Sequence, residues 1–208
     1  MKFRLIATLL LVVGAAAPAQ EPNPYAKAKV GDFATYKMTT KVAQITIDGV
    51  ITQQVTAVDP NKQVTISVSG KVGNPPQPIP GETEYKIDLT KPFDPTQANG
   101  PLPPGTEMQV EKVKEEKPRV EKVKVGGKEY DARVDTYKVK VKAGGMEFDA
   151  RLRAWVAADL PVPMAKMELA ADVAEQRLEV LMDLQETGNK PVEKKEPEKK
   201  DPKEGKKS

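Results

Sequence analysis

The sequence lacks histidine and cysteine, and it contains only three serines, Ser67, Ser69 and Ser208. Nucleophilic triads of the Ser-His-Asp or Cys-His kind therefore cannot form, and a zinc site of the usual ligand set is excluded. The chain also has no Gly-x-Gly-x-x-Gly fingerprint and no phosphate-binding loop that ends in Lys-Ser/Thr. We predict that the protein is not an enzyme and that it has no catalytic residue, no metal site and no cofactor.

Aromatic residues are scarce as well, with one tryptophan, five tyrosines and four phenylalanines among 208 residues. This scarcity argues against a sugar-binding cleft, in which paired carboxylates would be the enzymatic chemistry still open. The candidate acids alternate along strand-like segments: Glu129, Asp131, Glu147 and Asp149. We interpret them as the solvated side of a sheet, balanced across strands by Arg133, Arg151 and Arg153. A carboxylate hydrolase remains a remote alternative.

The longest apolar run is Leu5–Ala17, and it follows the basic residues Lys2 and Arg4. A positive start, a run too short to span a bilayer comfortably and small residues after it are typical of a secretory signal peptide. We expect cleavage between Ala19 and Gln20 and export to the periplasm or the extracellular space. No later run approaches the roughly 18 apolar residues of a membrane helix, so the mature protein is expected to have no transmembrane segment. Because cysteine is absent, neither a disulfide nor a lipid-modified cysteine is expected.

Basic residues (33) outnumber acidic ones (30), but the excess lies at the two ends of the chain. The body is close to neutral, with interleaved signs, which argues against nucleic-acid binding. From Gly188 the chain is rich in Lys, Glu and Pro and has no apolar residue after Val192, which predicts disorder. The predicted organisation is a signal peptide (1–19), a flexible lead-in (20–29), a single β domain (30–187) and a disordered tail (188–208).

A near-duplicate lies in the middle of the chain, where Val125–Arg133 returns as Ala143–Arg151. Each copy is a Gly-Gly pair followed by alternating apolar and charged residues, which is typical of a tight turn that leads into a β-strand. From Met146 to Val156 the even-numbered residues are all apolar and the odd-numbered ones mostly charged. This alternation predicts a strand with one buried side and one solvated side.

The same alternation predicts the other strands. Earlier strand-like runs cover residues 36–42, 45–47, 50–58, 63–69 and 82–89. We expect a two-residue hairpin turn at Asp48-Gly49 and a further turn at Asp59–Lys62. Two similar pieces, Val110–Lys114 and Val120–Lys124, are expected as strands on either side of a turn at Glu115–Pro118.

Three later positions leave structural alternatives open. Between residues 130 and 141 the apolar side chains change from even to odd numbers, so we expect a β-bulge or a bend near Asp135–Thr136. Met164–Leu184 alternates near its end but contains strong helix formers, and we favour a closing hairpin that turns at Ala171–Ala174 over a lid helix. Trp155 shares the charged face of its strand, where packing beneath the Asp159–Pro163 turn is favoured over a contact surface.

Together these patterns predict an all-β fold. We expect an antiparallel up-and-down meander of nine or ten strands with few or no helices, because strands follow one another without helical patterns between them. The apolar faces need cover, so the sheet is expected to be strongly curved or closed into an incomplete barrel. Proline-rich loops are expected to carry Phe93 and Leu102 as plugs over the edge of the core.

The candidate binding residues are four apolar side chains, Met38, Met146, Leu152 and Met167. Methionine is soft and adaptable, so these residues are expected to line an apolar groove inside the curved sheet. The alternative is that they fill an ordinary core. The groove predicts a binding or carrier module of the cell envelope with an apolar ligand, and the second hypothesis is a structural or interaction component whose partner is an envelope protein.

Several runs carry a resemblance to known proteins: Gly31-Asp32-Phe33, Lys86–Thr96, Val125–Asp131, Trp155, Asp159–Pro163 and Lys166-Met167-Glu168. In these runs the chain resembles a family of small exported bacterial β proteins, and the resemblance covers most of the mature body. That family has no assigned activity, so the resemblance supplies no functional residues. The ending is also distantly similar to the half-barrels of lipoprotein carriers, although their helices have no counterpart here.

Overall fold

The computed structural model describes residues 22–79, 83–95, 107–112, 117–143, 145–173 and 176–192. The predicted signal peptide, Leu102 and all of the tail after Val192 lie outside the described residues. No helix in the described part of the chain is long and apolar enough to cross a membrane.

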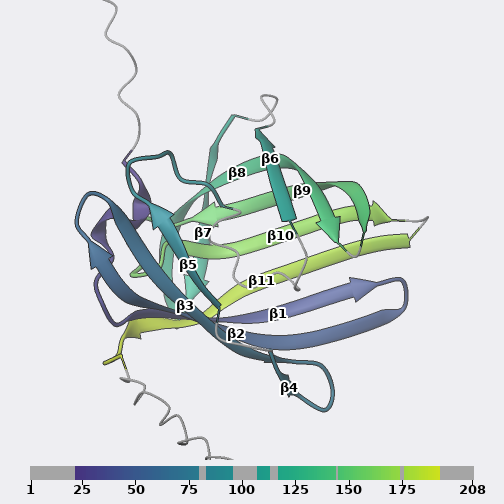
Figure 1. Ribbon diagram of the computed structural model, residues 1–208, viewed down its shortest axis with the longest axis horizontal. Helices are drawn as coiled ribbons and strands as arrows, with labels where there is room; N and C mark the ends of the chain where they lie inside the picture. The colour runs from purple at the N-terminus through teal and green to yellow at the C-terminus, as the bar shows by residue number, and fades with distance from the viewer. Residues whose placement is uncertain are drawn as a thin grey trace, which may run out of the picture.

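The fold is all-β, as predicted, and its strands form one antiparallel sheet (Figure 1). A single turn of 3-10 helix, η1 (Pro24–Lys27), precedes the strands. The strands are β1 (Asp32–Val42), β2 (Ile45–Asp59), β3 (Gln63–Val72), β4 (Gln77–Pro78), β5 (Thr83–Asp88), β6 (Glu107–Lys112), β7 (Arg119–Val125), β8 (Lys128–Ala143), β9 (Met146–Val156), β10 (Met164–Val173) and β11 (Gln176–Asn189).

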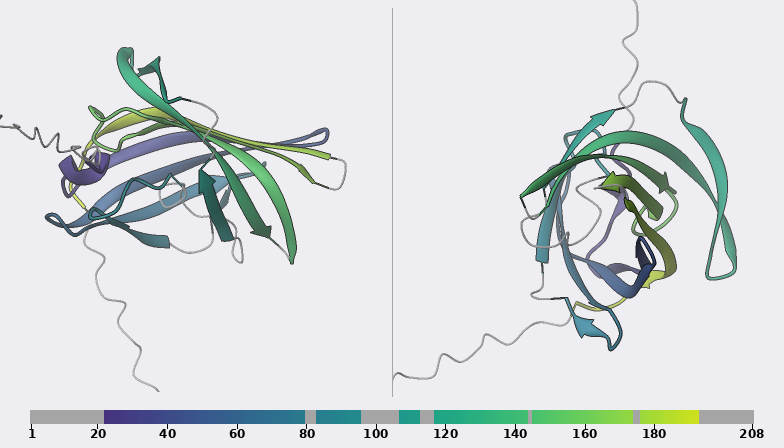
Figure 2. Two further views of the ribbon diagram at one scale, coloured as in Figure 1. Left: turned by 90° about the horizontal axis from the view of Figure 1, so that it is seen from above. Right: turned by 90° about the vertical axis from the view of Figure 1, so that its right-hand side faces the viewer.

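The first and the last strands meet in the middle of the sheet. The order is β3-β2-β1-β11-β10-β9-β8, so two meanders join through the pairing of β1 with β11. This ladder runs from Asp32 opposite Asn189 to Val42 opposite Leu178. Figure 2 shows that the sheet is strongly curved.

Each edge of the described sheet is an interrupted strand. β4 and β5 both pair with β3, and β6 and β7 both pair with β8, one after the other along the same strand. The predicted strand Val120–Lys124 lies within β7, and Val110–Lys112 of the other predicted piece lies within β6, while Val113 and Lys114 lie outside the described residues. The two strands lie one after the other along β8. Interrupted edges offer short rows of free backbone groups, which limits edge-to-edge pairing with other chains. The two edges do not pair with each other, so the sheet is not closed into a barrel.

Residues 22–29 differ from the predicted flexible lead-in, because η1 plugs one end of the core. Tyr25 is completely buried, and its ring stacks on Phe93 with 5.9 Å between the ring centroids. Phe93 therefore acts as the predicted plug. The Asn23 side chain caps η1 by accepting a hydrogen bond from the backbone N–H of Tyr25.

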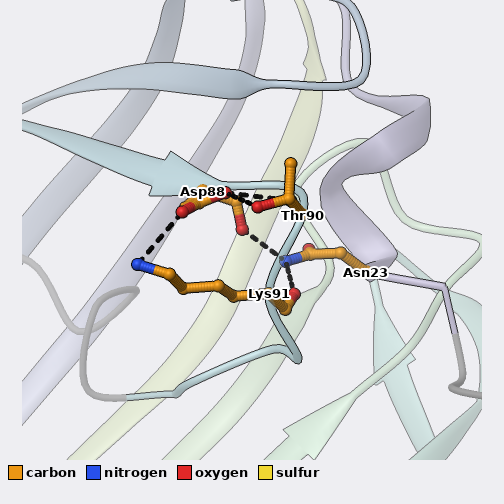
Figure 3. A network of polar contacts seen from close by, with 4 residues as sticks. All are labelled: Asn23, Asp88, Thr90 and Lys91. Atoms are coloured by element: carbon orange, nitrogen blue, oxygen red, sulfur yellow. Dashed lines mark hydrogen bonds and ion pairs between the residues drawn. The ribbon is translucent and has the colours of Figure 1, made fainter.

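Asn23 also ties η1 to the loop after β5 (Figure 3). Its side-chain amide donates to the backbone carbonyls of Asp88, at 3.4 Å, and Lys91, at 3.3 Å. The Asp88 carboxylate accepts from the backbone and the hydroxyl of Thr90 and pairs with Lys91. These contacts, above all the Thr90 hydroxyl, hold the pKa of Asp88 below its usual value.

The predicted hairpin turn at Asp48-Gly49 is wrong, because both residues lie inside β2. The hairpin between β1 and β2 instead turns at Ala43 and Gln44, with Val42 opposite Ile45. Gly49 is required by packing: an added Cβ would lie 2.8 Å from Val72 Cγ1 and 2.9 Å from a backbone oxygen. Glycine inside a strand often marks such a close approach, and sequence alone cannot distinguish it from a turn.

Of the two alternatives predicted near Asp135–Thr136, the β-bulge is wrong. β8 pairs with β9 without a register shift from Arg133 to Ala143. The apolar side chains change parity because opposite faces of β8 are buried at its two ends: Ala132 and Val134 on one face, and Tyr137, Val139 and Val141 on the other. When the apolar residues of a strand change from even to odd numbers, the buried face of the strand can therefore have changed without any shift of register.

The C-terminal segment forms the favoured hairpin and not a lid helix. β10 and β11 pair up to Val173 opposite Gln176, slightly later than the predicted turn. β11 continues to Asn189, so Gly188 belongs to the sheet rather than to the tail. The Phe33 ring lies against Gly188, where an added Cβ would be 3.1 Å from Phe33 Cε1. Asn189 donates hydrogen bonds to the Asp32 carboxylate and to the carbonyl of Val30.

Candidate functional site

The inner face of the sheet carries three neighbouring rows of side chains, defined by the strand register. The first row contains Gly49, Met38, Met182, Met167, Ala154 and Asp135. The second contains Ile47, Thr40, Val180, Leu169, Leu152 and Tyr137. The third contains Ile45, Val42, Leu178, Ala171, Ala150 and Val139.

In the second and third rows the residues on β8, β9 and β10 are buried, and those on β11, β1 and β2 are half-buried or exposed. Leu152 is completely buried and Val139 nearly so, whereas Ile47 is 40% exposed and Ile45 is 64% exposed. We call the exposed or half-buried part the inner apolar patch: Thr40, Val42, Ile45, Ile47, Leu178 and Val180. It lies on β1, β2 and β11, at the end of these strands away from η1. Thr40 is its only polar side chain, so the patch suits an apolar partner.

The predicted binding residues are only partly brought together. Met38 and Met167 lie in the same row, separated by Met182. Met167 and Leu152 are buried in the core, while Met38 is half-buried at the border of the inner apolar patch. Met146 is 56% exposed at the start of β9 and does not join them. The three methionines thus form a row between the filled core and the patch.

A depression of about 800 Å³ lies on the opposite, outer face of β1, β2 and β3. It is lined by Lys37, Asp48, Gly49, Val50, Thr52, Ser69, Gly70, Lys71, Gly73, Pro76 and Gln185. None of the four predicted binding residues belongs to this lining. The sequence could not reveal it, because its residues come from four separate strands and one loop.

The four candidate acids are exposed, and three of them form ion pairs with lysines. Asp131 pairs with Lys122 at 2.6 Å, Glu129 with Lys124 at 3.4 Å, and Glu147 with Lys140 and Lys142. These partners are lysines rather than the predicted arginines. The hydrogen bond from Lys140 and the charges of both lysines lower the pKa of Glu147. Glu147 is therefore held ionised and is poorly suited to donate a proton.

Trp155 is almost completely buried and is held by charged neighbours. Its indole N–H donates a 2.8 Å hydrogen bond to Glu121 of β7. The Arg153 guanidinium lies 4.6 Å and the Lys166 ammonium 4.7 Å from the ring centroid, within the range of cation–π attraction. Because Trp155 is buried, it offers no free contact surface.

A buried polar cluster lies at the far end of the first row. Asp135 is 5% exposed and forms a 2.8 Å ion pair with Arg133. Burial, reinforced by the Asp135 charge, raises the pKa of Tyr137 well above its usual value. No group of three or more acidic residues in the described part of the chain is arranged to hold a metal ion.

Comparison with known proteins gives two similar solved structures. One is a predicted exported protein with a YmcC-like fold from Bacteroides fragilis, with a TM-score of 0.47 and 9% identity over 78% of this chain and 97% of that one. The other is a predicted lipoprotein from Parabacteroides distasonis, with a TM-score of 0.49 and 10% identity over 81% of this chain and all of the other. No family model and no curated protein matches the sequence. Similarities at this level carry no functional assignment, and the likeness to lipoprotein-carrier half-barrels stays a prediction.

Proposed function

We propose that this chain is an exported, non-enzymatic binding module that holds the hydrocarbon chain of a lipid on the inner apolar patch. The observation that supports this function is the exposure of Ile45 and Ile47 at one end of rows whose other end is core. A soluble protein gains nothing by leaving such side chains in water, and covering apolar surface is worth about 25 cal/mol per Å². An exposed patch that is continuous with the core is therefore a candidate contact surface.

The chemistry of the patch favours a hydrocarbon chain over a polar ligand. The strands are about 4.8 Å apart and alternate residues about 6.8 Å apart, so the patch is roughly two rows deep and three strands wide. This is the scale of a folded or tilted acyl chain and not of a large planar cofactor. Thr40 alone offers a side-chain hydrogen bond, and the half-buried thioether of Met38 at the border can adapt to a flexible chain.

The test is binding of the neutral apolar fluorophore N-phenyl-1-naphthylamine to the mature chain, with displacement by a neutral long-chain alcohol. Ile47→Asp and Ile45→Asp place a carboxylate in the patch, and we expect each to weaken binding at least tenfold. Val120→Asp is the matched control, because Val120 is an exposed valine (69%) on β7, outside the patch. Equal loss in all three variants, or no saturable binding by the unsubstituted protein, would contradict the proposal.

A second candidate function, an interaction component of the envelope, is favoured by the free edge of β2. The ladder between β2 and β3 begins at Gly49 opposite Val72, and the Asp48 carbonyl accepts a 2.9 Å hydrogen bond from the N–H of Gly73, so only Ile45–Ile47 have β1 as their sole partner among the described strands. An extended segment of a partner protein could add to this edge by backbone hydrogen bonds. Cross-linking in intact cells through a photoreactive residue at Thr46 tests this function, and recovery of uncross-linked protein alone would count against it.

Export remains part of the proposal and rests on the N-terminal sequence pattern. N-terminal sequencing of the protein recovered outside the cytoplasm is expected to begin at Gln20. Recovery of a chain that still begins at Met1 would contradict cleavage.

A further inference from the structure

The outer depression carries a row of donors that the proposed lipid contact does not use. Lys37 on β1, Val50 on β2 and Lys71 on β3 are register partners and therefore share the outer face. The two lysines lie on either side of Val50, about 10 Å apart at their backbones, since neighbouring strands are about 4.8 Å apart. Thr52 and Ser69, also register partners, form the next row and add two hydroxyl groups, of which that of Thr52 also lies 3.2 Å from the Thr35 hydroxyl.

Neither lysine is neutralised by an ion pair with a described residue. Two carboxylates lie nearby, Asp48 on β2 and Asp183 on β11. Asp48 lines the depression and accepts a 2.8 Å hydrogen bond from the Thr39 hydroxyl, without an ion pair to either lysine. Asp183 is the register partner of Lys37 on β11, without an ion pair to it.

The shape of the depression also favours a ligand. Gly49, Gly70 and Gly73 contribute only backbone atoms to its lining. Val50, half exposed, and Pro76 provide an apolar base. A volume of about 800 Å³ is within the usual range for small-molecule sites, and much larger than a bare ion needs.

We propose that this outer depression binds a small organic molecule that carries a phosphate or carboxylate group. The two ammonium groups would pair with the anionic group, and the hydroxyls of Thr52 and Ser69 would donate to its oxygens, because charge-assisted hydrogen bonds of this kind are the strong ones. The site lies on the face of the sheet opposite the inner apolar patch. It therefore stands whether or not the proposed lipid contact exists.

The experiment is a titration of the isotope-labelled mature chain followed by backbone amide NMR shifts. The probes are glycerol 3-phosphate for the phosphate group and citrate for the carboxylate group, each at matched ionic strength in sodium chloride. We expect saturable shifts at Val50, Gly70 and Gly73 with at least one probe. The double variant Lys37→Gln/Lys71→Gln should weaken this binding at least tenfold.

The matched control is Lys128→Gln/Lys138→Gln, which removes two exposed lysines of β8 that also have no ion pair with a described residue. It should leave the affinity unchanged, and a thermal melt of both double variants checks that neither is unfolded. If just one of the two probes binds, the result shows whether the site prefers a phosphate or a carboxylate group. Shifts that do not saturate, that spread over lysines across the surface, or that survive loss of Lys37 and Lys71 would overturn the proposal.

Discussion

Two buried tyrosines in the core near η1 differ in the hydrogen bonding of their hydroxyl groups. The Tyr36 hydroxyl donates a 2.9 Å hydrogen bond to the backbone carbonyl of Met164. The Tyr25 hydroxyl is equally buried but has no hydrogen-bond partner among the described residues. A buried polar group without a partner costs stability, because it has lost its hydrogen bonds to water.

This contrast predicts opposite effects for the same substitution. Tyr25→Phe is expected to leave the free energy of unfolding unchanged or to raise it by up to about 1 kcal/mol, whereas Tyr36→Phe should lower it by about 1 kcal/mol. Urea unfolding followed by the fluorescence of the single tryptophan measures both. A larger loss for Tyr25→Phe than for Tyr36→Phe would show that the Tyr25 hydroxyl has a partner.

At the scale of elements, the hairpin of β7 and β8 is fastened to the sheet through Trp155. Val134 is the register partner of Trp155, and Glu121 on β7 is the register partner of Ala132. The apolar face of the hairpin is thus the face that carries Trp155, while Lys122 and Lys124 lie on the exposed face. The hydrogen bond from the Trp155 indole lowers the pKa of Glu121, and the charge of Arg119 lowers it further by a smaller amount.

The sign of this shift predicts a pH-dependent change at the hairpin. A carboxyl whose pKa is lowered by folding stabilises the folded state above its ordinary pKa, near 4.5, and the effect is lost as the pH falls through its lowered folded value. We expect the emission of Trp155 to shift to longer wavelength below pH 4.5 as Glu121 takes up a proton. Glu121→Gln should lack this step, because it has no carboxyl to titrate. A step of the same size and midpoint in Glu121→Gln would assign it to other acids.

At the scale of the whole molecule, β11 connects the two meanders. It pairs with β1 on one side and with β10 on the other, and its inner residues Met182 and Leu184 are buried. The β1–β11 ladder joins residues about 150 positions apart, so its formation requires the nearly complete chain. Without β11, β1 and β10 would each lose a neighbouring strand, and both would become exposed edges of a sheet.

Two truncations therefore distinguish the contribution of β11, which the fold requires, from that of the tail after Val192. A chain that ends at Val173 is expected to lose cooperative thermal unfolding and near-ultraviolet circular dichroism. A chain that ends at Val192 keeps every described strand and is expected to unfold as the full chain does. Cooperative unfolding of the shorter chain would contradict the central role of β11.

The part of the fold that could be predicted from the sequence is its local part. Period-two alternation located β3, β5 and β9, and turn residues located the connections at Asp59–Lys62 and Gly126-Gly127, because these signals act between neighbours in the chain. Both glycines of the second turn have positive φ, 56° and 82°, as a tight hairpin turn requires. The hairpin of β10 and β11 was also predictable, since strand alternation outweighed helix propensity.

Only the tertiary structure decided which faces are covered and which strands meet. Alternation shows that one side of a strand is buried but not what buries it, so the two ends of β8 were misinterpreted and Gly49 was assigned to a turn. For the same reason, the sequence placed Met38 near Met167 but also included Met146, which lies exposed at a strand end. The pairing of Lys37 and Lys71 across Val50 depends on register between three strands, and no local signal in the sequence encodes that register.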